Sequence, residues 1–166
     1  KKNISIGCTY SLADKRMSGL EMNYCVIASA HFFYYFRKHS YANKIIINLI
    51  GPIVKKIITK NKNTQFFVSL TNYYSLFFRS KNISYLHHLE DKVSGGYDLA
   101  GNFSYFNGAL DMMIGLAKYM GFAKVILLGC DYLGSPKLEG HFYSDSIPYY
   151  GTYDPQYVAR IKEVAN

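Results

Sequence analysis

The stretch FNGALDMMIGLAKYMGFAKVILLGCDY, residues 106–132, decides the fold that we expect for this chain. Apolar residues recur at helical spacing from Ala109 to Met120, and Gly121 follows in the position of a helix C-cap. The next run, KVILLGC (residues 124–130), is short, apolar and partly β-branched, as is typical of a strand covered on both faces of a parallel sheet. The stretch therefore predicts a helix, a one-glycine turn and a buried strand, with Asp131 where that strand ends.

Strand and helix patterns also alternate along the rest of the chain. Short apolar runs predict strands over residues 4–10, 24–29, 64–70 and 83–89, and residues 42–61 predict a helix that breaks at Gly51 and Pro52. This alternation predicts an α/β fold, a three-layer Rossmann-like sandwich with a mainly parallel sheet, as a single domain over residues 1–166. Because the chain starts almost inside a strand pattern and ends inside a helical one, we expect a truncated N-terminus, and a truncated C-terminus is left open.

The composition restricts the class of partner. Of the 166 residues, 49% are hydrophobic and 18% charged, which indicates a folded chain, and the net charge of +8 favours acidic partners such as phosphorylated small molecules. The chain has no arginine-rich stripe, zinc knuckle or RNP-like motif, so we expect no nucleic acid partner. It also has no 18-residue apolar span and no signal peptide, so we expect a cytoplasmic protein. Residues 45–58 either pack on the domain, the reading we favour, or touch the inner membrane peripherally, with Lys55 and Lys56 at the headgroups.

The three cysteines, Cys8, Cys25 and Cys130, stand far apart in apolar runs. An odd number with no CxxC spacing argues against a disulfide framework and against a zinc site. We therefore expect buried free thiols.

Polar residues follow several of the predicted strands. Ligands of open parallel sheets bind beyond the carboxyl ends of the strands. This rule selects the pair Thr9 and Tyr10, residues 29–31 beginning with Ser29, residues 69–72 and the pair Asp131 and Tyr132. We expect these positions to form one ligand site.

Asn107 and Gly108 precede the predicted helix of the opening stretch. Free N–H groups and the dipole at a helix N-terminus favour an anion such as a phosphate. Asp131 can accept hydrogen bonds from ribose hydroxyls, hold a metal or orient an acceptor sugar, and its structural alternative is a loop cap or an ion pair.

Three further residues lie in the loop after the last predicted strand. His141, in GHFYSD, can act as a general base, and its alternative is a surface histidine. Tyr143 and Tyr150 can donate hydrogen bonds to a phosphate or simply pack. P-loop, GxGxxG, GxSxG and HExxH motifs do not occur, so dinucleotide oxidoreductases and serine hydrolases lack their signatures.

The run NGALDMMIGLAKYMGFAKVILLGCDY and the following GHFY resemble a Rossmann-like family of bacterial surface-polysaccharide biosynthesis proteins. That family is similar to the Campylobacter-type sialyltransferases and to hydroxymethylpterin diphosphokinase-like proteins. The resemblance is specific over residues 107–143 and patchy elsewhere. It implies that Asn107, Gly108 and Asp131 help to hold a CMP-sugar, with Tyr143 or Tyr150 at the phosphate. The chain departs from the sialyltransferases at Thr152, where their base histidine would fall.

The residues and the resemblance together predict a nucleotide-sugar-dependent, sialyltransferase-like glycosyltransferase of lipopolysaccharide or capsule synthesis. A CMP- or UDP-sugar would be the substrate, with no further cofactor and no metal. The acceptor would be a glycan or a lipid-linked glycan, and His141 would deprotonate its hydroxyl. Two alternatives stay open: a Mg²⁺-dependent pyrophosphotransferase and a non-catalytic domain that binds a glycan or a partner. A homo-oligomer is also left open.

Overall fold

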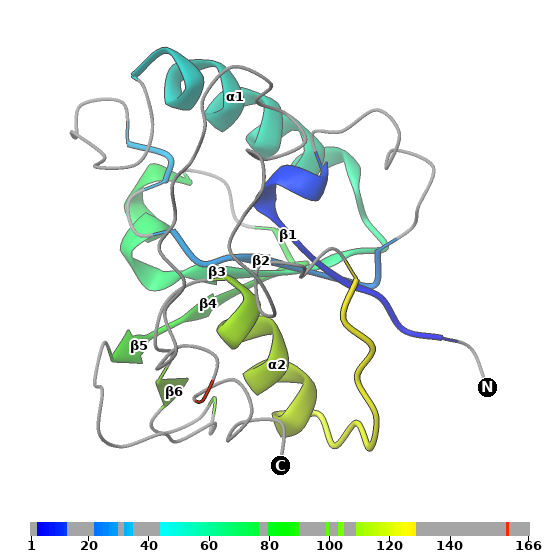
Figure 1. Cartoon of the computed structure of the whole chain (residues 1–166). Helices are drawn as coiled ribbons and strands as arrows, with labels where there is room; N and C mark the ends of the chain where they lie inside the picture. The colour runs from blue at the N-terminus through cyan, green and yellow to red at the C-terminus, as the bar shows by residue number, and fades with distance from the viewer. Residues whose placement is uncertain are drawn as a thin grey trace, which may run out of the picture.

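A computed structural model gives the arrangement of the chain and describes residues 3–12, 22–29, 32–34, 44–76, 80–89, 99, 103–104, 109–128 and 159. Four strands form one parallel sheet in the order β1-β2-β3-β4 (Figure 1). Their bounds are β1 (Ile6–Cys8), β2 (Tyr24–Ile27), β3 (Gln65–Ser69) and β4 (Ile83–Leu86). Two short strands, β5 (His88–Leu89) and β6 (Phe103–Ser104), form a separate parallel pair.

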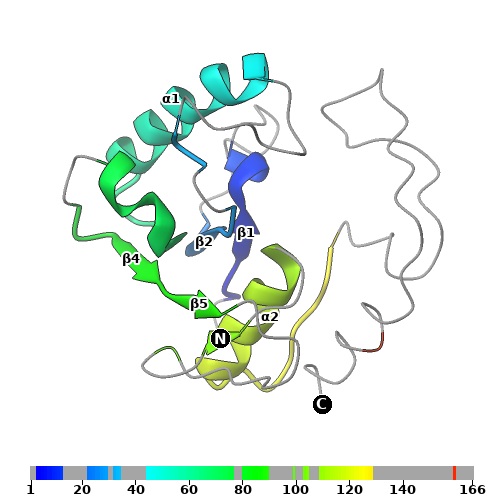
Figure 2. The ribbon, with the colours of Figure 1, turned by 90° about the vertical axis from the view of Figure 1, so that its left-hand side faces the viewer.

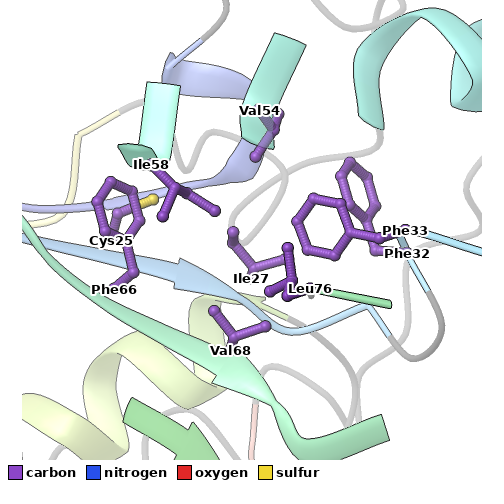
Figure 3. Close-up of a cluster of buried hydrophobic side chains, with 9 residues drawn as sticks. All are labelled: Cys25, Ile27, Phe32, Phe33, Val54, Ile58, Phe66, Val68 and Leu76. Atoms are coloured by element: carbon purple, nitrogen blue, oxygen red, sulfur yellow. The ribbon is translucent and has the colours of Figure 1, made fainter. Parts of the chain in front are cut away.

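One face of the sheet packs against helix α1 (Lys44–Lys60). Side chains alternate along a strand, so Cys25 and Ile27 of β2 point to this face, as do Phe66 and Val68 of β3. They form one buried cluster with Val54 and Ile58 of α1 and with Phe32, Phe33 and Leu76 (Figure 3). The predicted packing of residues 45–58 on the domain is therefore confirmed for the second half of α1.

The opposite face packs against helix α2 (Ala109–Tyr119). Val26 of β2, Ala28 directly after that strand and Phe67 of β3 meet Met112 and Leu116 of the helix. Val26 and Phe67 alternate with the residues that face α1, so both faces of the two strands are apolar and their sequences are continuous apolar runs.

Helix α2 ends as its sequence predicts. The N–H of Gly121 donates to the carbonyl of Lys118 at 2.9 Å, and the N–H of Phe122 donates to Ala117 at 3.1 Å. Gly121 has φ of 75°, a conformation that costs little without a Cβ atom. This pair of bonds is a Schellman motif, which satisfies the last carbonyls of the helix.

The predicted α/β fold is confirmed as a small parallel sheet with helices, whereas the complete three-layer sandwich stays a prediction. The predicted break of the first long helix is wrong, because α1 continues through Gly51 and Pro52. Pro52 lies on the exposed side of α1, where water can hydrate the carbonyl that a proline leaves without its helical donor. Among the described residues, no helix is both long and apolar enough to cross a membrane.

The strand predicted over residues 124–130 is not formed in its described part, residues 124–128. These residues are extended after the Gly121 turn but belong to neither sheet (Figure 2). Their aliphatic side chains are exposed, from 40% for Leu127 to 85% for Leu128. The prediction failed because an apolar run favours a strand only where a neighbouring backbone supplies the ladder hydrogen bonds.

Candidate functional site

Polar residues gather where three neighbouring strands end. Thr9 follows β1, Ser29 comes two residues after β2, and Ser69 is the last residue of β3. The three strands are parallel and adjacent, so their carboxyl ends share one edge of the sheet. The structure therefore places Thr9 and Ser29 and the start of residues 69–72 at the same edge, which is the one that the sequence analysis selected.

Thr9 opens the short 3-10 helix η1 (Thr9–Leu12) and is buried. Its hydroxyl donates to the carbonyl of Val26 in β2 at 3.4 Å. The side chain thus ties the chain after β1 to the neighbouring strand. With 5% of its surface exposed, Thr9 offers little side-chain surface for direct contact with a ligand.

Asn72 lies in the second 3-10 helix, η2 (Leu70–Ser75), and is fully buried. Its amide nitrogen donates to the carbonyl of Ser29 at 3.0 Å, and its side-chain oxygen accepts from the N–H of Phe33 at 3.2 Å. Asn72 therefore fixes the loop after β2 against the turn after β3. Residue 72 was predicted at the edge from its position after a strand. Its two bonds to main-chain groups could not be predicted, because those groups are about 40 residues away in the sequence.

Ser29 and Thr71, a serine and a threonine at this edge, are both exposed. The hydroxyls of Ser69 and Thr71 are 2.8 Å apart, so the buried Ser69 orients its exposed neighbour. Ser29 and Thr71 follow adjacent strands, and hydroxyls can both donate to phosphate oxygens and accept from ribose hydroxyls. A ligand at the edge would meet both of these residues directly.

An aromatic cluster borders the same edge. The ring centroids of Tyr73 and Tyr74 in η2 are 5.3 Å apart, and those of Tyr73 and Tyr85 are 5.1 Å apart. Tyr74 is 77% exposed, whereas burial and the neighbouring Tyr73 raise the pKa of Tyr85. Exposed tyrosine rings offer an apolar face and a polar hydroxyl, a combination that suits sugars and bases.

Lys55 joins α1 to this region. Its ammonium donates to the carbonyl of Ser75 at 2.7 Å and lies 5.7 Å from the ring centroid of Phe33. Partial burial lowers the pKa of Lys55. The residue that the membrane alternative assigned to lipid headgroups instead supports the turn after β3.

Asp111 lies in the first turn of α2 and is 1% exposed. Carboxylates are favoured at helix N-termini because they complement the helix dipole. An ionised Asp111 would also repel a phosphate at the same helix end. The prediction of a phosphate site at residues 107–108 took no account of this carboxylate.

The remaining predicted site residues lie outside the described part of the chain. They are Asn107, Gly108, Asp131, Tyr132, His141, Tyr143 and Tyr150. Their roles stay predictions. Within the described ranges, no group of three or more His, Cys, Asp or Glu side chains is placed to hold a metal.

Neither of the two described cysteines, Cys8 and Cys25, forms a disulfide. Cys25 is buried as predicted, whereas Cys8 is only half-buried. Burial, with a smaller contribution from Cys8, raises the pKa of the Cys25 thiol, which disfavours the nucleophilic thiolate.

We compared the chain with known proteins in three ways, and no protein-family model, curated protein sequence or solved structure matches it. The resemblance to bacterial surface-polysaccharide proteins therefore stays a prediction from the sequence.

Proposed function

We propose that the chain is a nucleotide-sugar-dependent glycosyltransferase of bacterial surface-glycan synthesis, built on a three-layer Rossmann-like domain. The observation that carries this proposal is the shared edge at which β1, β2 and β3 end, beside Thr9, Ser29 and Ser69. Ligands of parallel sheets bind at such edges. The net charge of +8 adds long-range attraction for the phosphates of a nucleotide-sugar.

The role that we propose for each residue at the edge follows from how exposed its side chain is. Ser29 and Thr71 present hydroxyls to the donor nucleotide, whereas Thr9 and Asn72 position the backbone of the loops around it. The exposed ring of Tyr74 offers a surface on which a sugar can stack.

Residues outside the described ranges supply the chemistry in this proposal. Asp131 accepts hydrogen bonds from ribose or acceptor hydroxyls. His141 takes the proton of the acceptor hydroxyl, whose oxygen then displaces the nucleotide from the anomeric carbon with inversion. Asn107, Gly108, Tyr132, Tyr143 and Tyr150 complete the nucleotide contacts, and the enzyme works in the cytoplasm, on a glycan or lipid-linked acceptor.

A ligand-observed NMR screen of the chain tests the proposal. CMP, UDP, GDP and their sugar conjugates are offered separately, each with and without Mg²⁺. We expect metal-independent binding of one nucleotide class. Binding that requires Mg²⁺ would favour the pyrophosphotransferase instead, and binding of none would contradict both enzymes.

Two variants then locate any binding that is found. Ser29→Tyr fills the edge beside β2, and we expect it to weaken nucleotide binding at least about tenfold. Because the Ser29 side chain is exposed, the larger residue should not disturb the fold. Asn63→Tyr, at an exposed loop position, is the matched control and should leave binding unchanged. Asp131→Ala should also weaken binding if Asp131 contacts the donor.

The non-catalytic alternative has one observation in its favour. The polar groups of Thr9 and Asn72 already bind main-chain atoms, as they would in a domain that uses them only for structure. If no nucleotide binds, this alternative is preferred. If a nucleotide binds and Ser29→Tyr leaves its signals unchanged, the edge is not the nucleotide site.

A further inference from the structure

Residues 124–128 carry the least protected apolar surface in the described part of the chain. Val125 is 47% exposed, Ile126 72% and Leu127 40%, and the three are consecutive. Contiguous exposed aliphatic side chains mark surfaces that meet a partner. The extended backbone and the β-branched residues suit a strand of a sheet.

The outer edge of β1 has the polar groups that such a strand requires. Among the described strands, β1 stands at one end of the order β1-β2-β3-β4 and pairs only with β2. The carbonyl of Ser5 accepts from the N–H of Tyr24 at 3.1 Å. Because residues alternate along a parallel ladder, Ser5 and Gly7 bond toward β2, and Ile6 turns its N–H and C=O outward.

The chain direction fits this edge. Helix α2 packs against β1 and β2, the strands at that end of the sheet. Residues 124–128 follow α2 after the Gly121 turn and run back in the opposite direction to the helix (Figures 1 and 2). A strand that runs opposite to α2 on this edge lies parallel to β1, as strands of β-helix-β units do.

The handedness of the connections also fits. The connection from β2 through α1 to β3 runs along the sheet away from β1, with its helix on one face. A connection from β4 through α2 to the outer edge of β1 would run along the sheet in the reverse direction, with its helix on the other face. Reversing both the direction and the face preserves the hand. A connection from β4 through α2 to the outer edge of β1 therefore has the same hand as β2-α1-β3, and nearly all parallel crossovers are right-handed.

We propose that residues 124–128 dock on the outer edge of β1 as a fifth parallel strand, with the peptide groups of Ile6 as partners. The strand order would then reverse between β1 and this segment. Ligands of open α/β sheets bind at such reversal points, so docking would create a crevice beside Thr9. This inference does not depend on glycosyl transfer, since it concerns the sheet and where a ligand crevice forms.

Amide hydrogen exchange on the intact chain, followed residue by residue by NMR, tests the docking. An edge strand bonds through alternate residues, so we expect slow exchange for Ile6 and for either Ile126 alone or both Val125 and Leu127. The protection should be at least about 100-fold relative to Lys62, an exposed loop residue. Unprotected exchange at Ile6 and throughout residues 125–127 would overturn the proposal. So would protection that appears only at concentrations at which the chain dimerises, because the partner would then be a second copy.

A pair of charge substitutions gives a second test that does not depend on exchange. In the structure Ile126 is more exposed than Ile53 of α1, at 72% against 49%. If exposure alone determined the effect, Ile126→Asp would lower the stability of the fold no more than Ile53→Asp does. Docking predicts the reverse order, with Tm lowered by about 5 °C for Ile126→Asp and by about 2 °C or less for Ile53→Asp. Equal shifts, or a larger shift for Ile53→Asp, would overturn the proposal.

Discussion

Strand β3 and residues 124–128 have the same length and similar apolar content, but opposite environments. In β3, Phe66, Phe67 and Val68 are between 0% and 7% exposed, whereas residues 125–128 are between 40% and 85% exposed. The difference lies in the neighbours. β3 has parallel partners on both sides and a helix over each face, whereas residues 124–128 belong to neither sheet. Apolar composition alone therefore does not determine whether a segment forms a strand.

The largest expected effect comes from removing the central side chain of β3. Phe66 is completely buried among Cys25, Ile58 and their neighbours (Figure 3). Phe66→Ala should lower the free energy of unfolding by about 3–5 kcal/mol, since it removes apolar contacts and leaves a cavity. Urea unfolding followed by circular dichroism measures this loss. Tyr74→Ala, at an exposed aromatic residue, is the control, and we expect a loss of about 0.5 kcal/mol or less. Equal losses for the two variants would show that β3 is not the centre of the core.

A smaller loss is expected where β3 leads into the candidate site. Asn72→Ala removes the donor to the Ser29 carbonyl and the acceptor for the Phe33 N–H. The free energy of unfolding should fall by about 2–4 kcal/mol, because two buried main-chain groups lose their partners. Asn63→Ala, the same substitution at an exposed asparagine, should cost less than about 1 kcal/mol. If the two substitutions cost the same, the loop after β2 does not depend on Asn72.

The pH dependence of stability tests the burial of the strand beside β3. Cys25 of β2 pairs in register with Phe66, and burial raises the pKa of its thiol. The folded chain therefore keeps this proton at pH values where the unfolded chain has lost it. Stability should not depend on Cys25 below the ordinary thiol pKa of about 8.5, and should fall above it by at most about 1.4 kcal/mol per pH unit.

Urea unfolding between pH 7.5 and 9.5 measures that slope. Cys25→Ala should reduce the fall in stability above pH 8.5, and the difference between the two chains isolates the thiol. A slope that is unchanged in the variant would mean that Cys25 titrates in the folded state as it does in the unfolded chain.

The smallest effects compare two glycines, one of which sets the direction of residues 124–128. Gly121→Ala forces a side chain into a positive φ and should cost about 1 kcal/mol. Gly51→Ala in α1 meets no atom within 4 Å and should instead stabilise the chain by about 0.5–1 kcal/mol, because alanine favours the helix. Thermal unfolding of the two variants would show shifts of opposite sign, and shifts of the same sign would contradict the turn geometry.

The sequence by itself determined the local elements. The strands in β2 and β3, the α2 helix with its Gly121 ending, and the polar residues that follow the strands were all predicted from periodicity and from capping residues. These features depend on interactions between residues that are close in the sequence. A short stretch of sequence is therefore enough to predict them.

Only the tertiary structure decided which elements meet. The double hydrogen bond of Asn72, the burial of Asp111 and the exposure of residues 124–128 all depend on groups far away in the sequence. The continuity of α1 through Pro52 likewise depends on which side of the helix the core covers. The local sequence around a residue does not determine these features. The free energy of a buried polar group, or of a strand, depends on the partner that the fold brings to it.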